Sequence, residues 1–155
     1  MILVADTSGL LAALDRAHVE HDRCRDALNE AALTVVSPMV LTELDHLLRR
    51  SVKQTAVRDD RSAGARRSRQ VLGWVLAESD RLRMAVPVLS AAQLKVAGAV
   101  MDRYAGLALD LADAVTVVLA EEYATDAVLT LDHRDFRSMR PLTPHPAFRI
   151  MPADL

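Results

Sequence analysis

The stretch Ile2-Leu3-Val4-Ala5-Asp6-Thr7-Ser8-Gly9 decides the fold class. Its four apolar residues fit a short strand buried on both faces, and the polar residues that follow fit a turn into a helix that Ser8 or Thr7 can cap. Four other short stretches are also read as strands, and the third of them contains Pro87, which restricts it to an edge of the sheet. These stretches are 33–36, 127–131, 86–89 and 148–150.

Apolar residues at helical spacing fill most of the chain between these strands. Helices are expected after Ser8, after Ser37-Pro38 and after Ser90, where a serine can accept a free backbone N–H, and also over 19–31, 71–82 and 111–123. Gly64 is expected to break the helical pattern. Strands that alternate with helices predict an α/β fold, a three-layer α/β/α sandwich with a mainly parallel sheet of about four to five short strands.

Length and composition favour one compact domain spanning 1–155. The chain has 155 residues, 51% hydrophobic and 26% charged, and its lone Cys24 excludes a disulfide framework and a cysteine-rich zinc site. No apolar stretch approaches the roughly 20 residues needed to cross a bilayer, and the opening MILVAD reaches an acid too early for a signal peptide. We therefore expect a cytoplasmic protein without membrane contact.

The net charge of −2 conceals a strong asymmetry along the chain. The segment 49–69 holds eight Lys and Arg against two acids, a net charge of +6, so the remainder carries −8. A charge run of this kind is usually a solvated helical surface. Here the segment begins six residues after Glu43, a candidate site residue. This position suggests that it forms a positively charged rim that binds a polyanion beside the site.

Carboxylates mark the expected site. Asp6 and Asp132 each follow a predicted strand directly, and in parallel sheets sites form beyond the carboxyl ends of the strands. Asp113 and Glu43 lie among apolar neighbours on predicted helices, where an unpaired carboxylate is costly, whereas Asp110 is explained by helix capping. Several acids without matching cations indicate a divalent metal site, and oxygen ligands favour Mg²⁺ or Mn²⁺ over Zn²⁺.

Four sequence blocks, in order along the chain, resemble the signature blocks of the PIN domain, and more narrowly those of VapC ribonuclease toxins of bacterial and archaeal toxin–antitoxin pairs. The blocks are Val-Ala-Asp6-Thr-Ser-Gly-Leu-Leu-Ala, Ser-Pro-Met-Val-Leu-Thr-Glu43-Leu, Leu-Ala-Asp113-Ala and Leu-Thr-Leu-Asp132-His-Arg-Asp135-Phe. The resemblance implies that Asp6, Glu43, Asp113 and Asp132 surround one or two Mg²⁺ or Mn²⁺ ions. The metal would activate water to cleave an RNA phosphodiester, leaving a 5′-phosphate and a 3′-hydroxyl.

Further residues and partners follow from the same resemblance. Thr7 is expected as a supporting hydroxyl that steadies Asp6 or a water, and Asp110 and Asp135 as additional acids of the pocket. The resemblance also implies a homodimer, a cognate VapB-type antitoxin, and transfer RNA or ribosomal RNA as substrate. The residues expected to contact RNA are Arg49, Arg50, Lys53, Arg66, Arg67 and Arg69.

Two other classes of protein share parts of this pattern. A receiver-type phosphoacceptor domain would need a lysine after a late strand, and the only lysines, Lys53 and Lys95, lie in helical contexts. A catalytically inert PIN-like module that binds RNA or protein predicts the loss of at least one of the four acids, and all four are present. Toxin endoribonuclease is the interpretation the sequence favours.

Overall fold

A computed structural model describes residues 1–55, 61–107 and 109–155, and side chains outside 51–61. It contains a five-stranded, entirely parallel sheet with the strand order β3-β2-β1-β4-β5. The strands are β1 (Ile2–Ala5), β2 (Leu33–Val36), β3 (Met84–Ala85), β4 (Ala127–Leu129) and β5 (Arg149–Met151). The parallel sheet predicted from the alternating pattern is confirmed.

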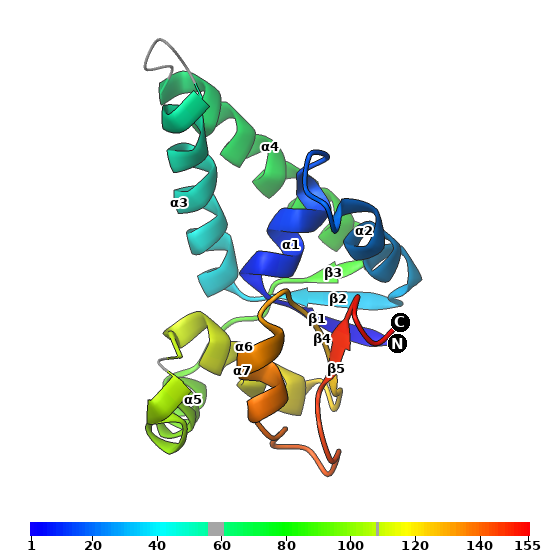
Figure 1. Ribbon diagram of the computed structural model, residues 1–155, viewed down its shortest axis with the longest axis vertical. Helices are drawn as coiled ribbons and strands as arrows, with labels where there is room; N and C mark the ends of the chain where they lie inside the picture. Colours follow the sequence, from blue (N-terminus) through cyan, green and yellow to red (C-terminus); the bar gives the residue numbers. More distant parts are fainter. Residues whose placement is uncertain (56–60, 108) are drawn as a thin grey trace.

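Helices cover both faces of this sheet (Figure 1). One face packs against the helices α1 (Thr7–Leu14), α2 (His21–Glu30), α3 (Pro38–Thr55) and α4 (Arg61–Asp80). The other face packs against α5 (Ala91–Arg103), α6 (Leu111–Glu122) and α7 (His133–Ser138), and a short 3₁₀ turn, η1 (Ala105–Leu107), precedes α6. The expected three-layer α/β/α sandwich is therefore confirmed. No helix within the described ranges is long and apolar enough to cross a membrane.

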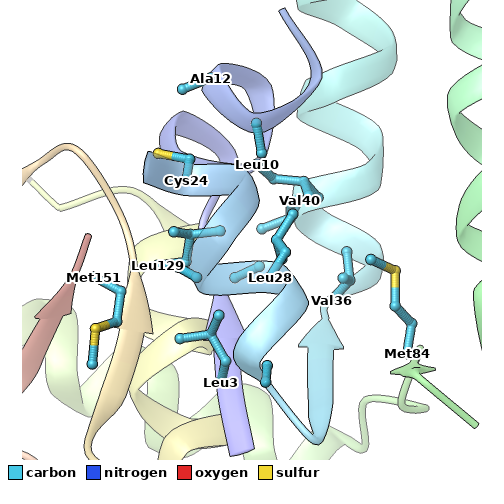
Figure 2. Close-up of a cluster of buried hydrophobic side chains, with 14 of the residues drawn as sticks. Leu3, Leu10, Ala12, Cys24, Leu28, Val36, Val40, Met84, Leu129 and Met151 are labelled. Carbon is cyan, nitrogen blue, oxygen red and sulfur yellow. The ribbon is translucent and has the colours of Figure 1, made fainter. Parts of the chain in front are cut away.

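Alternate residues of each strand serve the two faces of the sheet, as strand geometry requires. Leu3 and Leu129 face α1 and α2, where Figure 2 shows them with Leu10 and Leu28 in one buried cluster. Val4, next to Leu3 in sequence, belongs to the cluster under α5 and α6. Because both faces are covered, the strands read as continuous apolar runs rather than as alternating ones.

The turn after β1 differs from expectation in its cap. Asp6, not Ser8 or Thr7, is the N-cap of α1, and its carboxylate accepts the Ser8 N–H at 3.4 Å. Gly9 is required because a Cβ there would lie 2.6 Å from the carbonyl oxygen of Leu129 on β4. The close approach holds the first turn of α1 against β4.

The third strand also differs from expectation, since β3 is Met84–Ala85 rather than 86–89. Met84 and Ala85 pair with Thr34 and Val35 at the edge of the sheet. Pro87 has no N–H to donate to a ladder, which explains why pairing stops before it.

Helices α3 and α4 form an antiparallel pair that extends away from the sheet (Figure 1). Gly64 lies inside α4 and does not break it, contrary to the prediction; a Cβ there would come within 2.9 Å of the Arg49 Cα, so glycine permits close packing of the two helices. Asp45 of α3 links them further, because it accepts a hydrogen bond from Ser68 of α4; within α3 it also accepts one from Arg49 Nε (2.9 Å).

The side of the sheet on which successive strands are added changes at β1. The sheet extends from β1 through β2 to β3 on one side, and through β4 to β5 on the other. β1 and β4 pair in register at Ala5 and Leu129, so the residues after both strands meet at one edge. Crevices at such switch points are the usual ligand sites of open α/β sheets.

Candidate functional site

The four predicted acids come to this edge from four elements. Asp6 follows β1 and caps α1, and Asp132 follows β4 and caps α7. Glu43 lies on α3, and Asp113 lies in the first turn of α6. The charges of Asp6 and Asp132 both act on the carboxyl of Asp113, and that of Asp6 also acts on Glu43, so the structure brings all four into electrostatic contact.

Two hydroxyl groups hold the Asp6 carboxylate. Ser8 Oγ donates to Asp6 Oδ2 at 2.7 Å, and Thr130 Oγ1 donates to the same oxygen at 2.8 Å. Asp6 is only 5% exposed and Thr130 is fully buried. The other carboxylate oxygen, Asp6 Oδ1, accepts no hydrogen bond from the described residues, so it remains available to a ligand.

The same hydroxyls connect the two turns at the switch point. Ser8 Oγ accepts the backbone N–H of Leu131 at 2.9 Å, and Thr130 Oγ1 accepts that of Asp132 at 3.0 Å. Each hydroxyl therefore joins the Asp6 carboxylate to the turn that carries Asp132. Sequence reasoning missed Thr130 and gave Ser8 only a capping role. The available signal was a hydroxyl residue two positions from each strand-end aspartate.

Glu43 is paired with Thr7. The Thr7 hydroxyl donates to Glu43 Oε2 at 2.5 Å, so it supports Glu43 rather than Asp6. Burial raises the pKa of Glu43, and the charges of Asp110 and Asp6 raise it further, while the Thr7 hydrogen bond offsets part of the effect. Thr7 thus favours the ionised form of Glu43, whereas burial and the charges of Asp110 and Asp6 favour its protonated form.

Asp113 and Asp110 form a reciprocal cap at the start of α6. Asp113 N–H donates to Asp110 Oδ1 at 3.0 Å, and Asp110 N–H donates to Asp113 Oδ2 at 3.2 Å. Burial raises the pKa of Asp113 to about 7, and the nearby charges of Asp110, Asp6 and Asp132 contribute. Asp110 is therefore both the helix cap that the sequence predicts and a charged neighbour of the site. A carboxyl that titrates near neutral pH is typical of functional sites.

Asp132 is exposed at the rim of the cluster, and its Oδ1 accepts the Asp135 N–H at 3.3 Å. Asp135 thus contacts the site through its backbone N–H. Its half-buried side chain makes no hydrogen bond to the other acids within the described part of the chain.

The chemistry of this cluster suits a divalent cation. No Lys, Arg or His side chain outside 51–61 forms an ion pair with these acids, whose like charges destabilise one another. As the side chains lie, no three His, Cys, Asp or Glu of the described residues form a group that could hold a metal. Glu43, Asp110 and Asp113 instead engage neighbouring hydrogen-bond donors. To bind a metal ion, these carboxylates must therefore rotate. All of the ligand atoms that they offer are oxygens, which suits a hard divalent cation.

The predicted RNA-contacting residues lie on the pair α3 and α4. Arg49, Arg50, Arg66 and Arg69 are exposed and Arg67 is half-buried, whereas the side chain of Lys53 lies outside the described residues. Arg49 is paired with Asp45, and Arg67 Nη2 lies 3.8 Å from Asp15 Oδ1.

Comparisons with known proteins agree with this geometry. The PIN domain family matches residues 3–140. The chain is 33% identical to Ribonuclease VapC26 of Mycobacterium tuberculosis over 144 residues, which cover 90% of this chain and 93% of that protein. In fold it is similar to Mycobacterium tuberculosis VapC20, described as a sarcin-ricin loop cleaving toxin, with a TM-score of 0.69, 16% identity, and coverage of 85% of this chain and 91% of that one. VapBC2 from Rickettsia felis, solved with a promoter DNA fragment, matches with a TM-score of 0.62 at 14% identity, covering 97% of this chain and 98% of that one.

Proposed function

The chain belongs to the PIN domain family, and from this we propose that it is a divalent-metal-dependent endoribonuclease, the toxin of a VapBC-type toxin–antitoxin pair. One observation supports this most. At the switch point of the sheet four acids converge, and no basic side chain of the described residues forms an ion pair with them: Asp6, Glu43, Asp113 and Asp132. VapC nucleases of this family are generally dependent on a divalent metal. We assign this activity to one PIN-like domain spanning 1–155.

Mg²⁺, or Mn²⁺ in its place, is the cation we assign to this site, with Asp6, Glu43, Asp113 and Asp132 as its protein ligands. Bound there, the cation would supply positive charge against the anionic phosphodiester and lower the pKa of a water molecule. Asp6 offers Oδ1 while Ser8 and Thr130 fix its Oδ2. Glu43 and Asp113 are the candidates to accept a proton from the attacking water, since both carboxyls lie within electrostatic reach of Asp6 at this site.

The arginines of α3 and α4 would bind the phosphates that flank the scissile bond. Arginine forms bidentate contacts with phosphate, and the low aromatic content of 3% favours recognition of RNA shape and backbone. We expect neutralisation of Arg66, Arg67 and Arg69 together to weaken RNA binding and leave metal affinity intact. Equal RNA affinity of wild type and triple variant at physiological salt would refute this role.

The partners we propose are a cytoplasmic transfer RNA or ribosomal RNA as substrate, a VapB-type antitoxin as inhibitor, and a second copy of the chain in a homodimer. The match to a solved VapBC complex is compatible with the antitoxin. The alternative is an inert PIN-like module that binds RNA or protein without cleaving it. The presence of all four acids, with Asp6 held by hydrogen bonds from Ser8 and Thr130, favours the nuclease.

The test is expression of the protein and of its Asp6→Asn variant, followed by sequencing of cellular RNA 5′ ends. The proposal predicts new 5′-phosphate ends that require Asp6, and these ends also identify the substrate. Cleavage and growth arrest that persist in the variant would refute the mechanism. RNA binding without any new ends, in both proteins, would support the inert module instead.

A further inference from the structure

The face of α3 beside Glu43 carries a hollow that the other three acids of the site do not line. It has a volume of about 390 Å³ and is lined by Thr42, Glu43, His46 and Leu47. Its lining is mostly apolar, with the exposed His46 and with Leu47, which is 40% exposed. Because Glu43 belongs both to this hollow and to the acidic cluster, whatever occupies the hollow lies next to the reacting phosphate.

A second hollow lies next to the first, and Leu47 lines both. Its volume is about 380 Å³, and three basic side chains line it, Arg50, Arg67 and His18. Asp15 is also part of its wall and lies 3.8 Å from Arg67. Arg50 has no ion-pair partner among the described side chains, so this hollow presents at least one uncompensated positive charge.

Glu43, Leu47 and Arg50, one residue each from the acids, the apolar hollow and the cations, lie in this order along α3. At about 1.5 Å rise per residue, Leu47 lies roughly 6 Å and Arg50 roughly 10 Å beyond Glu43. The order is acids, apolar hollow, cations. An RNA strand suits this order once a divalent cation occupies the acids, since phosphates are then attracted at both ends and a base fits the apolar hollow between them.

A peptide suits the same track less well. Without a metal, the track would require a chain with a basic end at Glu43 and an acidic end at Arg50, separated by one apolar side chain. An imidazole next to a leucine is moreover a surface on which an unpaired base can stack.

We propose that His46 and Leu47 form a base-binding subsite beside the cleavage centre, and that Arg50 and Arg67 bind a phosphate further along the same single-stranded RNA. This inference rests on the proposed nuclease function and extends it, because it names the segment of RNA bound and the face of the protein that binds it. His46 and Leu47 contribute affinity for the base, while Arg50 contributes affinity for the backbone regardless of sequence.

The experiment compares a short fluorescent single-stranded RNA with the same RNA made abasic, using fluorescence anisotropy in Ca²⁺. The full chain with its four acids intact serves as the background, and Ca²⁺ replaces Mg²⁺ so that a divalent cation can still occupy the acids while cleavage is suppressed. Adding His46→Ala and Leu47→Ala is expected to weaken binding of the base-bearing RNA about tenfold and to leave the abasic RNA unchanged. Unchanged thermal unfolding checks that the exposed substitutions do not disturb α3.

Adding Arg50→Gln instead is expected to weaken binding of both RNAs. It should also reduce the slope of log affinity against log salt by about 0.7, the value for one phosphate contact on a single strand. Arg81→Gln is the matched control, because Arg81 is exposed, pairs with Glu78 and precedes β3, at the opposite edge of the sheet. It should change neither affinity nor slope.

Four results would overturn the subsite. The double variant could weaken both RNAs equally, or weaken neither, while the unsubstituted track still binds RNA; either outcome removes the base subsite and leaves the nuclease proposal standing. The variants could lose binding of the co-expressed antitoxin and keep that of RNA, which would assign the track to a peptide. If the protein binds neither RNA and no Asp6-dependent 5′ ends arise in cells, the proposed function fails together with the subsite.

Discussion

Replacing Asp113 by asparagine should stabilise the metal-free protein while abolishing cleavage. The rise of the Asp113 pKa from 3.8 to about 7 means that the ionised form destabilises the folded state. That rise corresponds to at most about 4 kcal/mol, and partial exposure of the side chain lowers the expected gain to about 2 to 4 kcal/mol. Asparagine keeps an oxygen to accept the Asp110 N–H, so the helix cap survives the substitution.

The sign of the pH dependence follows from which state holds the proton. Between pH 4 and 7 the folded protein keeps a proton on Asp113 that the unfolded chain has lost, so wild-type stability falls as pH rises through this range. Above pH 7 the carboxyl is ionised in both states and the full penalty applies. The asparagine of the Asp113→Asn variant carries no charge, and the gain from the substitution should therefore appear at pH 8 and vanish near pH 4.

Thermal unfolding in the presence of a chelator measures this directly. At pH 8 the variant should melt about 4 to 16 °C above wild type, the shift expected from that free energy for a chain of this size. Asp102→Asn is the matched control, because Asp102 is exposed on α5, and it should change stability by no more than about 0.5 kcal/mol. Saturating Mg²⁺ should stabilise wild type and have little effect on the Asp113→Asn variant. A variant that is less stable than wild type at pH 8, or equally stabilised at pH 4 and pH 8, would refute the reasoning.

Three further predictions concern the supports of the site and of the sheet. Thr130→Val should lower the free energy of unfolding in urea by about 1 to 3 kcal/mol and reduce cleavage, since the Asp132 N–H loses its buried acceptor, whereas Thr130→Ser should retain both; equal activity of the valine variant would contradict a positioning role. Gly9→Ala should cost about 1 to 3 kcal/mol in a melting experiment because its Cβ would collide with Leu129, and Gly73→Ala, with nothing within 4 Å of the added Cβ, should gain about 0.5 to 1 kcal/mol as the control. Arg149 lowers the pKa of Asp126 through two hydrogen bonds from its Nε and one from its Nη2, so the stability they contribute should be lost as pH falls below 4, and Asp126→Asn should flatten the acid limb of a pH-stability curve; an unchanged limb would count against it.

The sheet was predictable because its strands are short apolar runs between polar turns. β1 and β2 begin and end at the predicted residues, and the acids after β1 and β4 lie at one edge because the two strands are adjacent. What the pattern could not supply was the position of β3, which depends on pairing with Thr34 and Val35, or the continuity of α4 through Gly64, which depends on contact with Arg49.

The acids of the site could be predicted from the sequence, but the residues that hydrogen-bond to them could not. Asp6 and Asp132 stand out by position, and Glu43 and Asp113 by the apolar residues around them. The bond from Thr130 to Asp6 spans 124 positions, and the position of Thr130 two residues before Asp132 does not by itself reveal Asp6 as its partner. Thr7 illustrates the same limit, because its partner Glu43 becomes identifiable only when α3 packs beside α1.

The measurement that tests the central claim most directly is anomalous diffraction from crystals of the protein soaked in MnCl₂. We predict an anomalous peak among Asp6, Glu43, Asp113 and Asp132, with Asp6 Oδ1 as a ligand and Oδ2 still bonded to Ser8 and Thr130. Asp6→Asn crystals should show that peak weakened or lost. A protein that cleaves RNA in Mn²⁺ and yet shows no peak within reach of these four acids would contradict the proposed metal site.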